Sequence, residues 1–445
     1  MKRNIFAAIA VLICICSQAI AQTDEVSLEE VIALALEQNY DVRLFKNSAT
    51  TAATDDKFSI GGLIPVITTN GSRTWNSNDQ KQTLADQSKV ERNGIRTNNL
   101  TANVQATWLL FDGLRMFATR ERLDQIAQQG ELNVKNQMVN TIANVIVNYH
   151  DVVRQKQQLK AIREQLAVSE ERVRLADRRL SVGTGAKPEL LQAKVDMNAQ
   201  RTAILQQQTT IQQVKDQLNG LVNNQLPPVY DVADTIIINL ELRQEEIADN
   251  IENSSFSLQS FKKSTEIATL VLRERKGERY PFINAIGSYN FSRAENSLVI
   301  NNFTTLFNQN LGLNYGFNFS FPIVNGLINR RNIQQARITV DRTRLLYDQA
   351  KTNINVGVKN AYTSYDNAKK ILLVEEENIG LARENLYIAL EIFKRSANTF
   401  IEVRTAQQSL ADAYNRLINA RYVAKVAETQ LLQLNGSLLR NTPNK

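Results

Sequence analysis

The sequence predicts a mainly α-helical fold with a smaller transmembrane β part, and three observations support this. No proline occurs between Leu114 and Lys187 or between Ile323 and Thr442, and both stretches carry apolar residues at seven-residue intervals. Four other segments alternate apolar and polar residues at period two. The same order of predicted helices and strands occurs twice along the chain. Seven-residue repeats indicate long helices that coil on one another, whereas strict alternation indicates strands.

The chain begins with the features of a signal peptide, predicted over residues 1–21. Basic residues precede an apolar run that ends at Ala19-Ile20-Ala21, so we expect cleavage after Ala21 and an exported protein. The alternative is an uncleaved membrane anchor, for which the run is short. Both cysteines, Cys14 and Cys16, lie within the run, which leaves the mature chain without disulfides or thiol chemistry.

The charge pattern argues against nucleic acid as a partner. The formal net charge is +7, but the basic residues are scattered without a compact run, and an exported chain seldom meets nucleic acid. We interpret the charge as solvated helix faces, with contact to anionic lipid as the alternative. No later segment has the roughly 18 consecutive apolar residues of a membrane-spanning helix.

An internal duplication divides the mature chain. The segment 63–72 aligns with 279–288, which superposes Pro65 on Pro281, and 111–115 aligns with 324–328. Constant offsets with matching proline and glycine make chance similarity improbable, and repeats of this kind define structural units. We therefore expect a first repeat at 22–220, a linker at 221–240, a second repeat at 241–436 and a C-terminal tail at 437–445.

Each repeat is predicted to hold the same elements in the same order. A helical stretch comes first, at 27–60 and 241–278, and Ser27 followed by Glu30 has the spacing of a capping box at its start. Two strands follow, near 64–76 and 98–111 in the first repeat and near 281–293 and 310–324 in the second. The polar or mixed segments 77–97 and 294–309 are predicted to be the loops between them.

The second strand of each repeat has one apolar and one polar face. Its alternate positions are Leu100, Ala102, Val104, Ala106, Trp108 and Leu110 in the first repeat and Leu311, Leu313, Tyr315, Phe317, Phe319 and Phe321 in the second. A row of aromatic side chains is costly in water but suits lipid and its interfaces. The pattern favours membrane strands, with a soluble sandwich or an extended adhesin strand as the alternative.

Two long helices complete each repeat. Residues at seven-residue intervals form apolar seams, and a second seam of alanines in the last helix allows close approach. The breaks at 181–187 and 394–398 read as hairpin turns between antiparallel helices. The seams are Met138, Val145, Val152, Leu159, Leu166, Val173 and Leu180; Lys351, Val358, Tyr365, Leu372, Ile379, Leu386 and Phe393; Leu190, Met197, Ile204, Ile211 and Leu218; Val403, Leu410, Leu417, Ala424 and Leu431; and Ala406, Ala413, Ala420 and Ala427.

Four strands cannot close a membrane barrel alone. An open edge in lipid leaves backbone groups unpaired at several kcal/mol each, and about eight strands is the practical minimum. Several subunits would therefore have to contribute their strands to one shared barrel.

The order of elements, the duplication and the turn segments 181–193 and 396–417 resemble the TolC-like outer-membrane efflux proteins over essentially the whole mature chain. The resemblance implies a homotrimer with a shared twelve-stranded β-barrel and an α-barrel of long antiparallel helices crossing the periplasm. It also implies a passive exit duct in the outer membrane, joined to an inner-membrane transporter through a periplasmic adaptor, or membrane fusion, protein.

The resemblance also assigns roles to residues. The hairpin tips would dock the adaptor and close the tunnel, although the second tip lacks the usual glycine and Arg404 stands where the family has an apolar residue. Two acidic residues, Glu189 and Glu402, would form a pore constriction, or only favour the helix dipole in a first turn. The tip residues are Ser181, Val182, Gly183, Thr184 and Gly185, with Arg395, Ser396, Ala397 and Asn398; the lipid-facing belt is Leu100, Val104, Trp108, Leu110, Leu313, Tyr315, Phe317, Phe319 and Phe321.

The sequence offers no catalytic or cofactor-binding constellation. It contains neither a nucleophile elbow, nor a phosphate-binding glycine-rich loop, nor HExxH. The single histidine, His150, is expected at a surface or in a helix seam, because one histidine without arranged carboxylates cannot hold a metal. Besides the efflux duct, a non-conducting coiled-coil tether of the periplasm or cell surface remains open, whereas an exported enzyme lacks a site.

Overall fold

The structure, a computed structural model, describes residues 24–248, 251–298, 305–395 and 399–440. The predicted signal peptide and the tail beyond residue 440 lie outside the described residues. The chain forms two compact units, each assembled from segments of both halves of the sequence. One contains the described parts of 24–48, 131–260 and 348–440, and the other contains 49–130 and 261–347.

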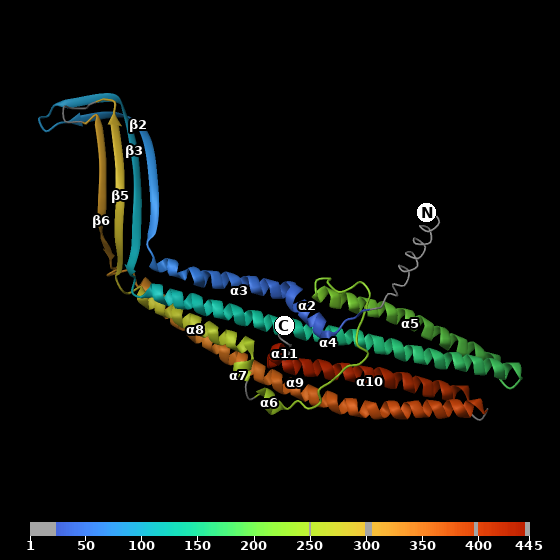
Figure 1. The fold of residues 1–445 in the computed structure, drawn as a ribbon. Coiled ribbons are helices and arrows are strands. Elements are labelled where there is room, and N and C mark those ends of the chain that lie inside the picture. The colour runs from blue at the N-terminus through green and yellow to red at the C-terminus, as the bar shows by residue number, and fades with distance from the viewer. Residues whose placement is uncertain (1–23, 249–250, 299–304, 396–398, 441–445) are drawn as a thin grey trace, which may run out of the picture. The chain divides into compact units, whose positions relative to one another are not determined.

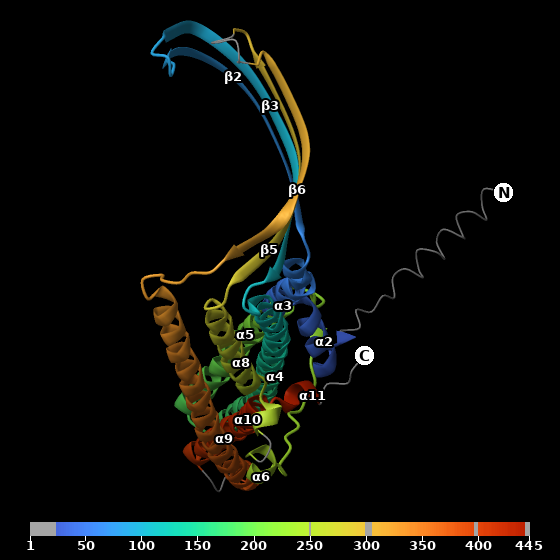
Figure 2. The same ribbon diagram turned by 90° about the vertical axis from the view of Figure 1, so that its left-hand side faces the viewer.

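A four-stranded antiparallel sheet dominates the second unit (Figure 1). It consists of β2 (Val66–Thr83), β3 (Lys89–Phe111), β5 (Phe282–Asn296) and β6 (Phe307–Ser320) in the order β2-β3-β5-β6. The four predicted strands are confirmed. Figure 2 shows that the sheet bends strongly along its strands.

The predicted loop at 77–97 is wrong for most of its length. The strands β2 and β3 continue to Thr83 and from Lys89, and only 84–88 connect them. Asp86 holds this turn by accepting hydrogen bonds from the backbone N–H and hydroxyl of Ser88. Hydrophobic periodicity missed this arm because Val90 and Ile95 are the only large apolar residues of its strands and do not alternate, whereas backbone pairing does not require apolar side chains.

The boundaries of the second hairpin also differ from the prediction. Its strands extend to Asn296 and begin at Phe307, so the loop predicted at 294–309 is shorter, and its residues 299–304 lie outside the described part of the chain. At the other end, β6 stops at Ser320 rather than at 324, close to Pro322, which cannot donate to a strand ladder.

Two pairs of long helices have matching lengths. The helices α4 (Arg115–Ser181) and α9 (Ile328–Lys394) each have 67 residues, and α5 (Lys187–Leu221) and α10 (Phe400–Leu434) each have 35. Helices of 67 residues are about 100 Å long. The predicted seam of α9 is buried from Val358 to Phe393, as are the Val403 seam and the alanine seam of α10. The predicted turn at 181–187 lies between α4 and α5, whereas residues 396–398 of the predicted turn at 394–398 lie outside the described residues.

The repeated motif ahead of each long helix has a backbone explanation. Gly113 and Leu114 both have positive φ, 77° and 64°, and so do Gly326 and Leu327, 62° and 64°. Two successive left-handed residues turn the chain from a strand into a helix, and glycine adopts this conformation without steric cost. A Cβ at Gly113 would also lie 2.2 Å from the carbonyl oxygen of Gly277.

Short elements precede the strands. They are β1 (Asp24–Glu25), α2 (Leu28–Gln38), α3 (Tyr40–Phe58) and the 3-10 helix η2 (Ser59–Leu63) in the first half, and α6 (Gln244–Ala248), α7 (Ile251–Ser254) and α8 (Phe256–Gly277) in the second. The stretches 27–60 and 241–278, each predicted to be a single helical stretch, therefore consist of several shorter helices. The predicted cap is present, since the Ser27 hydroxyl accepts from the N–H of Glu30 at 3.2 Å. A last short helix, α11 (Ser437–Arg440), follows α10.

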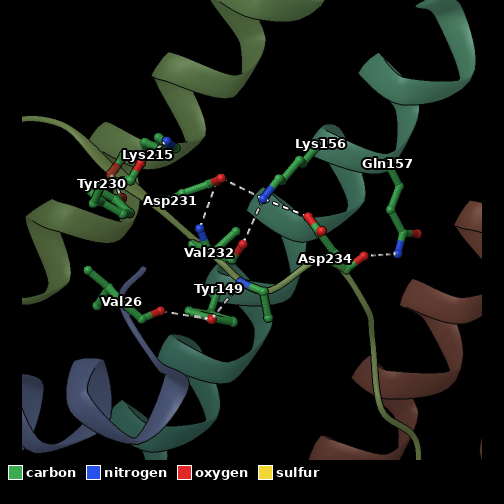
Figure 3. A network of polar contacts seen from close by, with 10 residues as sticks. Val26, Tyr149, Lys156, Gln157, Lys215, Tyr230, Asp231, Val232 and Asp234 are labelled. Atoms are coloured by element: carbon green, nitrogen blue, oxygen red, sulfur yellow. Dashed lines mark hydrogen bonds and ion pairs between the residues drawn. The ribbon is translucent and has the colours of Figure 1, made fainter. Parts of the chain in front are cut away.

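The predicted linker is anchored to α4 by a polar network (Figure 3). Its short strand β4 (Tyr230–Asp231) pairs in parallel with β1. The Lys156 ammonium group donates to Asp231 at 2.7 Å and forms an ion pair with Asp234 at 2.7 Å. Burial alone would lower the pKa of Lys156, but the hydrogen bonds to these carboxylates outweigh it and raise the pKa. The Tyr149 hydroxyl donates to the Val26 carbonyl oxygen at 3.0 Å, so the linker and the N-terminal segment share one anchor.

Candidate functional site

The strand register places the apolar rows of β3 and β6 on the same face of the sheet. Val104 pairs with Tyr289 of β5, and Tyr289 pairs with Leu313. Trp108 is connected to Phe317 in the same way. Side chains of directly paired residues point to the same side of a sheet. The rows therefore form one continuous surface, which is called the apolar face below.

The opposite face of the sheet is mostly polar, although the register also places Val66, Phe282 and Ile286 on it. It carries Thr68, Asn70, Ser72 and Thr74; Thr101, Asn103, Gln105 and Thr107; Asn284, Ser288, Asn290 and Ser292; and Asn310, Asn314, Asn318 and Ser320. A sheet with one apolar and one polar face matches the lipid-facing and lumen-facing sides of a membrane barrel.

Most predicted belt residues lie on the apolar face. Tyr315 and Phe317 are 86% and 76% exposed in the single chain. Leu100, Val104, Trp108, Leu313 and Phe319 share this face by register. Leu110 falls at an irregularity between Leu109 and Phe111, and Phe321 follows the end of β6, so the register does not assign a face to either.

The first hairpin tip is a tight turn between α4 and α5. The N–H groups of Thr184 and Gly185 both donate to the Arg179 carbonyl oxygen at 2.9 Å. Gly183 has a φ of 79°, and a Cβ at Gly185 would lie 2.9 Å from the Leu180 nitrogen. Both glycines are therefore required by the turn itself. Ser181 ends α4, and Val182 is among the exposed apolar residues of the tip.

The second hairpin tip is described only at its two ends. Arg395 follows α9, whereas the predicted docking residues Ser396, Ala397 and Asn398 lie outside the described residues. Thr399 caps α10, since its hydroxyl accepts from the N–H of Glu402 at 3.4 Å. Glu402 thus lies in a first helical turn, as Glu189 does in α5. The helix dipole favours a carboxylate at both positions.

A buried polar cluster near the two tips was not predicted from the sequence. The guanidinium of Arg172, which is 2% exposed, donates to Gln407 at 2.6 Å and to Asp196 at 3.1 Å. Arg404, which stands where the family has an apolar residue, forms an ion pair with the same Asp196 at 3.3 Å. Burial lowers the pKa of Arg172, and Asp196 opposes this. The available sequence signal was the spacing of the polar residues 165, 169 and 172, which places them on one face of α4.

His150 lies in a helix seam, one of its two expected environments. Its Nδ1 faces the Ile146 carbonyl oxygen at 2.7 Å, and its ring contacts the edge of Tyr149. Burial lowers the pKa of His150 to about 4, and the nearby charge of Lys425 acts in the same direction. The imidazole is therefore neutral at pH 7. Within the described part of the chain, no group of three or more His, Cys, Asp or Glu residues is placed to hold a metal ion.

None of the helices in the described residues is long and apolar enough to cross a membrane.

Comparison with known proteins gives a consistent result. The family described as "Outer membrane efflux protein" matches residues 31–224 and 248–437. The outer membrane efflux protein BepC of Brucella suis biovar 1 is 23% identical over 354 residues, covering 76% of this chain and 72% of BepC. The outer membrane protein TolC of Salmonella enteritidis is 22% identical over 363 residues, covering 78% and 71%.

A solved structure shows the same fold. The outer membrane protein VceC of Vibrio cholerae superposes with a TM-score of 0.73 at 15% identity, covering 92% of this chain and 96% of VceC.

Proposed function

Because the chain belongs to the outer membrane efflux protein family, we propose that three copies assemble into the exit duct of a tripartite efflux or secretion system. The protein is an efflux channel of the outer membrane with a long periplasmic helical part. In the proposed assembly, an inner-membrane transporter supplies the substrate and a periplasmic adaptor protein couples that transporter to the duct.

The four-stranded sheet with its single apolar face carries the proposal of a trimer. Within the described chain, β2 and β6 are the outer strands, and each pairs with one neighbour only. An unpaired strand edge in lipid is unfavourable by several kcal/mol for each backbone group. Pairing β6 of one copy with β2 of the next removes every edge, and three copies supply twelve strands, which exceeds the minimum of about eight.

The apolar face would contact lipid and the polar face would line the lumen. By register this assigns Leu100, Val104, Trp108, Leu313, Tyr315, Phe317 and Phe319 to the lipid side, and we extend the assignment to Leu110 and Phe321. All of these except Leu100, which is half-buried, are exposed in the single chain, and this supports the assignment because a monomeric soluble protein rarely leaves a large contiguous apolar patch in water.

The long helices would continue the duct as an α-barrel. Several large apolar residues of α9 remain exposed in the single chain, which supports contact with a neighbouring copy. They are Val356, Ile371, Leu373, Val374, Leu381, Ile388 and Ile392.

The hairpin tips would dock the adaptor and narrow the pore. Ser181, Val182, Gly183, Thr184 and Gly185 form the first docking surface, and Arg395, Ser396, Ala397 and Asn398 form the second. Glu189 and Glu402 of three subunits would place six carboxylates around one constriction, which favours cations over anions.

A tryptophan scan of two glycines tests the docking role. A Cβ at Gly183, in the tip, or at Gly220, near the far end of α5, would meet no atom within 4 Å. We expect Gly183→Trp to abolish export in cells while the purified trimer persists, and Gly220→Trp to preserve both. Gly183→Ala imposes the same backbone strain at a φ of 79° without the bulk, so it should retain export if the docking surface rather than the turn is what Trp disrupts. Normal export by the Gly183→Trp variant would contradict the docking assignment.

A further inference from the structure

Three arginines lie on the apolar face just beyond its last apolar row. Arg73 pairs with Leu100, and Leu100 pairs with Arg293 of β5. Two residues further along, Trp75 pairs with Asn98, and Ser77 then pairs with Arg96. Alternate residues share a face, so the apolar surface ends in a basic row. We define the rim cluster as Arg73, Arg96 and Arg293 together with Trp75, Asn98, Glu295 and Phe307.

Hydrogen bonds connect the rim cluster but leave it positively charged. Arg73 Nε donates to Asn98 Oδ1 at 3.2 Å, and Asn98 Nδ2 donates to Glu295 Oε2 at 3.1 Å. Arg293 Nε donates to the other oxygen of Glu295 at 2.9 Å. The rim cluster thus holds one carboxylate for three guanidinium groups; Glu295 pairs with Arg293, and among the described residues Arg96 has no acidic partner.

Aromatic rings flank two of these arginines. The guanidinium carbon of Arg73 lies 4.9 Å from the centre of the Trp75 ring, and that of Arg293 lies 5.2 Å from the centre of the Phe307 ring. Trp75 is 69% exposed. Aromatic residues gather where a membrane protein passes from hydrocarbon to headgroups. The rim cluster therefore has the composition of a membrane interface with added positive charge.

We propose that the rim cluster binds the phosphate group of an anionic lipid at the membrane surface. The inference rests on the proposed function, because it requires the apolar face to contact lipid. Arginine forms paired hydrogen bonds with phosphate oxygens, and the apolar rows beside the cluster would receive the acyl chains. The opposite ends of the strands lead into the helices, which are periplasmic, so the lipid belongs to the outer leaflet.

Tryptophan fluorescence gives a direct test, because Trp75 and Trp108 are the only tryptophans of the chain. The Trp108→Phe variant leaves Trp75 as the sole reporter. The protein is reconstituted at low salt into phosphatidylcholine vesicles that contain increasing fractions of brominated phosphatidylglycerol or, separately, brominated phosphatidylcholine. Bromine quenches only a ring that the labelled lipid contacts.

The halving fraction is the fraction of brominated lipid that reduces Trp75 emission by half. We expect it to be on the order of fivefold lower for brominated phosphatidylglycerol than for brominated phosphatidylcholine, which is the effect of roughly one uncompensated arginine near an anionic membrane surface. Replacing Arg73, Arg96 and Arg293 with glutamine should remove this preference, whereas Arg92→Gln, an exposed arginine of β3 outside the cluster, should retain it. Equal halving fractions, or a preference that survives the triple substitution, would overturn the inference while leaving the membrane sheet intact.

Two further outcomes separate the alternatives. Absence of quenching by either lipid would contradict the membrane position of the sheet, and so the proposed function itself. A preference that soluble glycerol phosphate abolishes would assign the cluster to soluble phosphate esters and overturn the assignment to lipid.

Discussion

At the scale of single residues, His150 connects the stability of the helical unit to pH. Its folded-state pKa of about 4 lies below the ordinary value of 6.5, because the ring is buried. Because the folded-state pKa is depressed, the neutral imidazole contributes its full stabilisation of the folded state above pH 6.5. This contribution is lost as the pH falls from 6.5 through about 4. The difference corresponds to about 3 kcal/mol.

We predict that His150→Gln loses this part of the acid sensitivity. Thermal unfolding in detergent, followed by the helical circular dichroism signal from pH 7 to pH 4, should show a smaller fall in midpoint for the variant than for the original chain. Carboxylates also titrate in this range, and the comparison of the two chains cancels their effect. If the unfolding midpoints of the variant and the original chain fell equally with pH, His150 would not be the cause of the acid sensitivity.

Arg172 and Arg404 share one carboxylate partner but differ in burial, and this allows a matched comparison. Arg172→Met removes a buried charge that also contacts Gln407 and the Phe400 ring, so we predict a loss of about 3 kcal/mol in the free energy of unfolding. Arg404→Met removes an exposed charge and should cost less than about 1 kcal/mol. Thermal midpoints of the two variants measure the difference, and equal losses would argue against the buried cluster as a stabilising element.

At the scale of elements, the two faces of β6 make opposite predictions for neighbouring residues. Phe317 lies on the apolar face and Asn318 on the polar face. We predict that Phe317→Arg impairs insertion by about 2–4 kcal/mol if the residue faces mid-bilayer. Asn318→Arg should instead leave assembly unchanged and alter ion selectivity. Yields of inserted protein and bilayer recordings on both variants test this, and a reversed pattern would exchange the two faces.

The sequence predicted those elements whose signal is periodic over a long stretch. The seams of α9 and α10 were read correctly because each buries one residue in seven against a partner helix, and the apolar face of β6 because its alternation is unbroken. The arm formed by 77–83 and 89–97 was missed, since Val90 and Ile95 are its only large apolar residues and form no alternating pattern. The division at Asn39 was also missed; its side chain accepts from the N–H of Asp41 and starts a new helix.

Only part of the candidate site could be predicted from the sequence. Gly183 and Gly185 identified the first tip, and the capping spacing from Thr399 to Glu402 identified the start of α10. The partners of Arg172 and the rim cluster could not be predicted, because both depend on residues from different parts of the sequence meeting in space. Arg73 and Arg293 are brought into one row only by the register through Leu100.

At the scale of the whole molecule, one chain leaves two strand edges and an apolar sheet face unsatisfied. In the proposed trimer, closure of three sheets into one barrel would pair the strand edges, and the lipid around that barrel would cover the apolar face. The exposed apolar residues of α9 would be covered by a neighbouring copy in the same assembly. The proposed functional protein is therefore a conducting trimer.

Single-channel conductance of the purified mature protein in a planar bilayer, combined with its mass in detergent, tests directly whether three chains form one conducting barrel. We predict a trimer that inserts and conducts. A monomer that never inserts would contradict the shared barrel, and would favour a coiled-coil tether that conducts nothing.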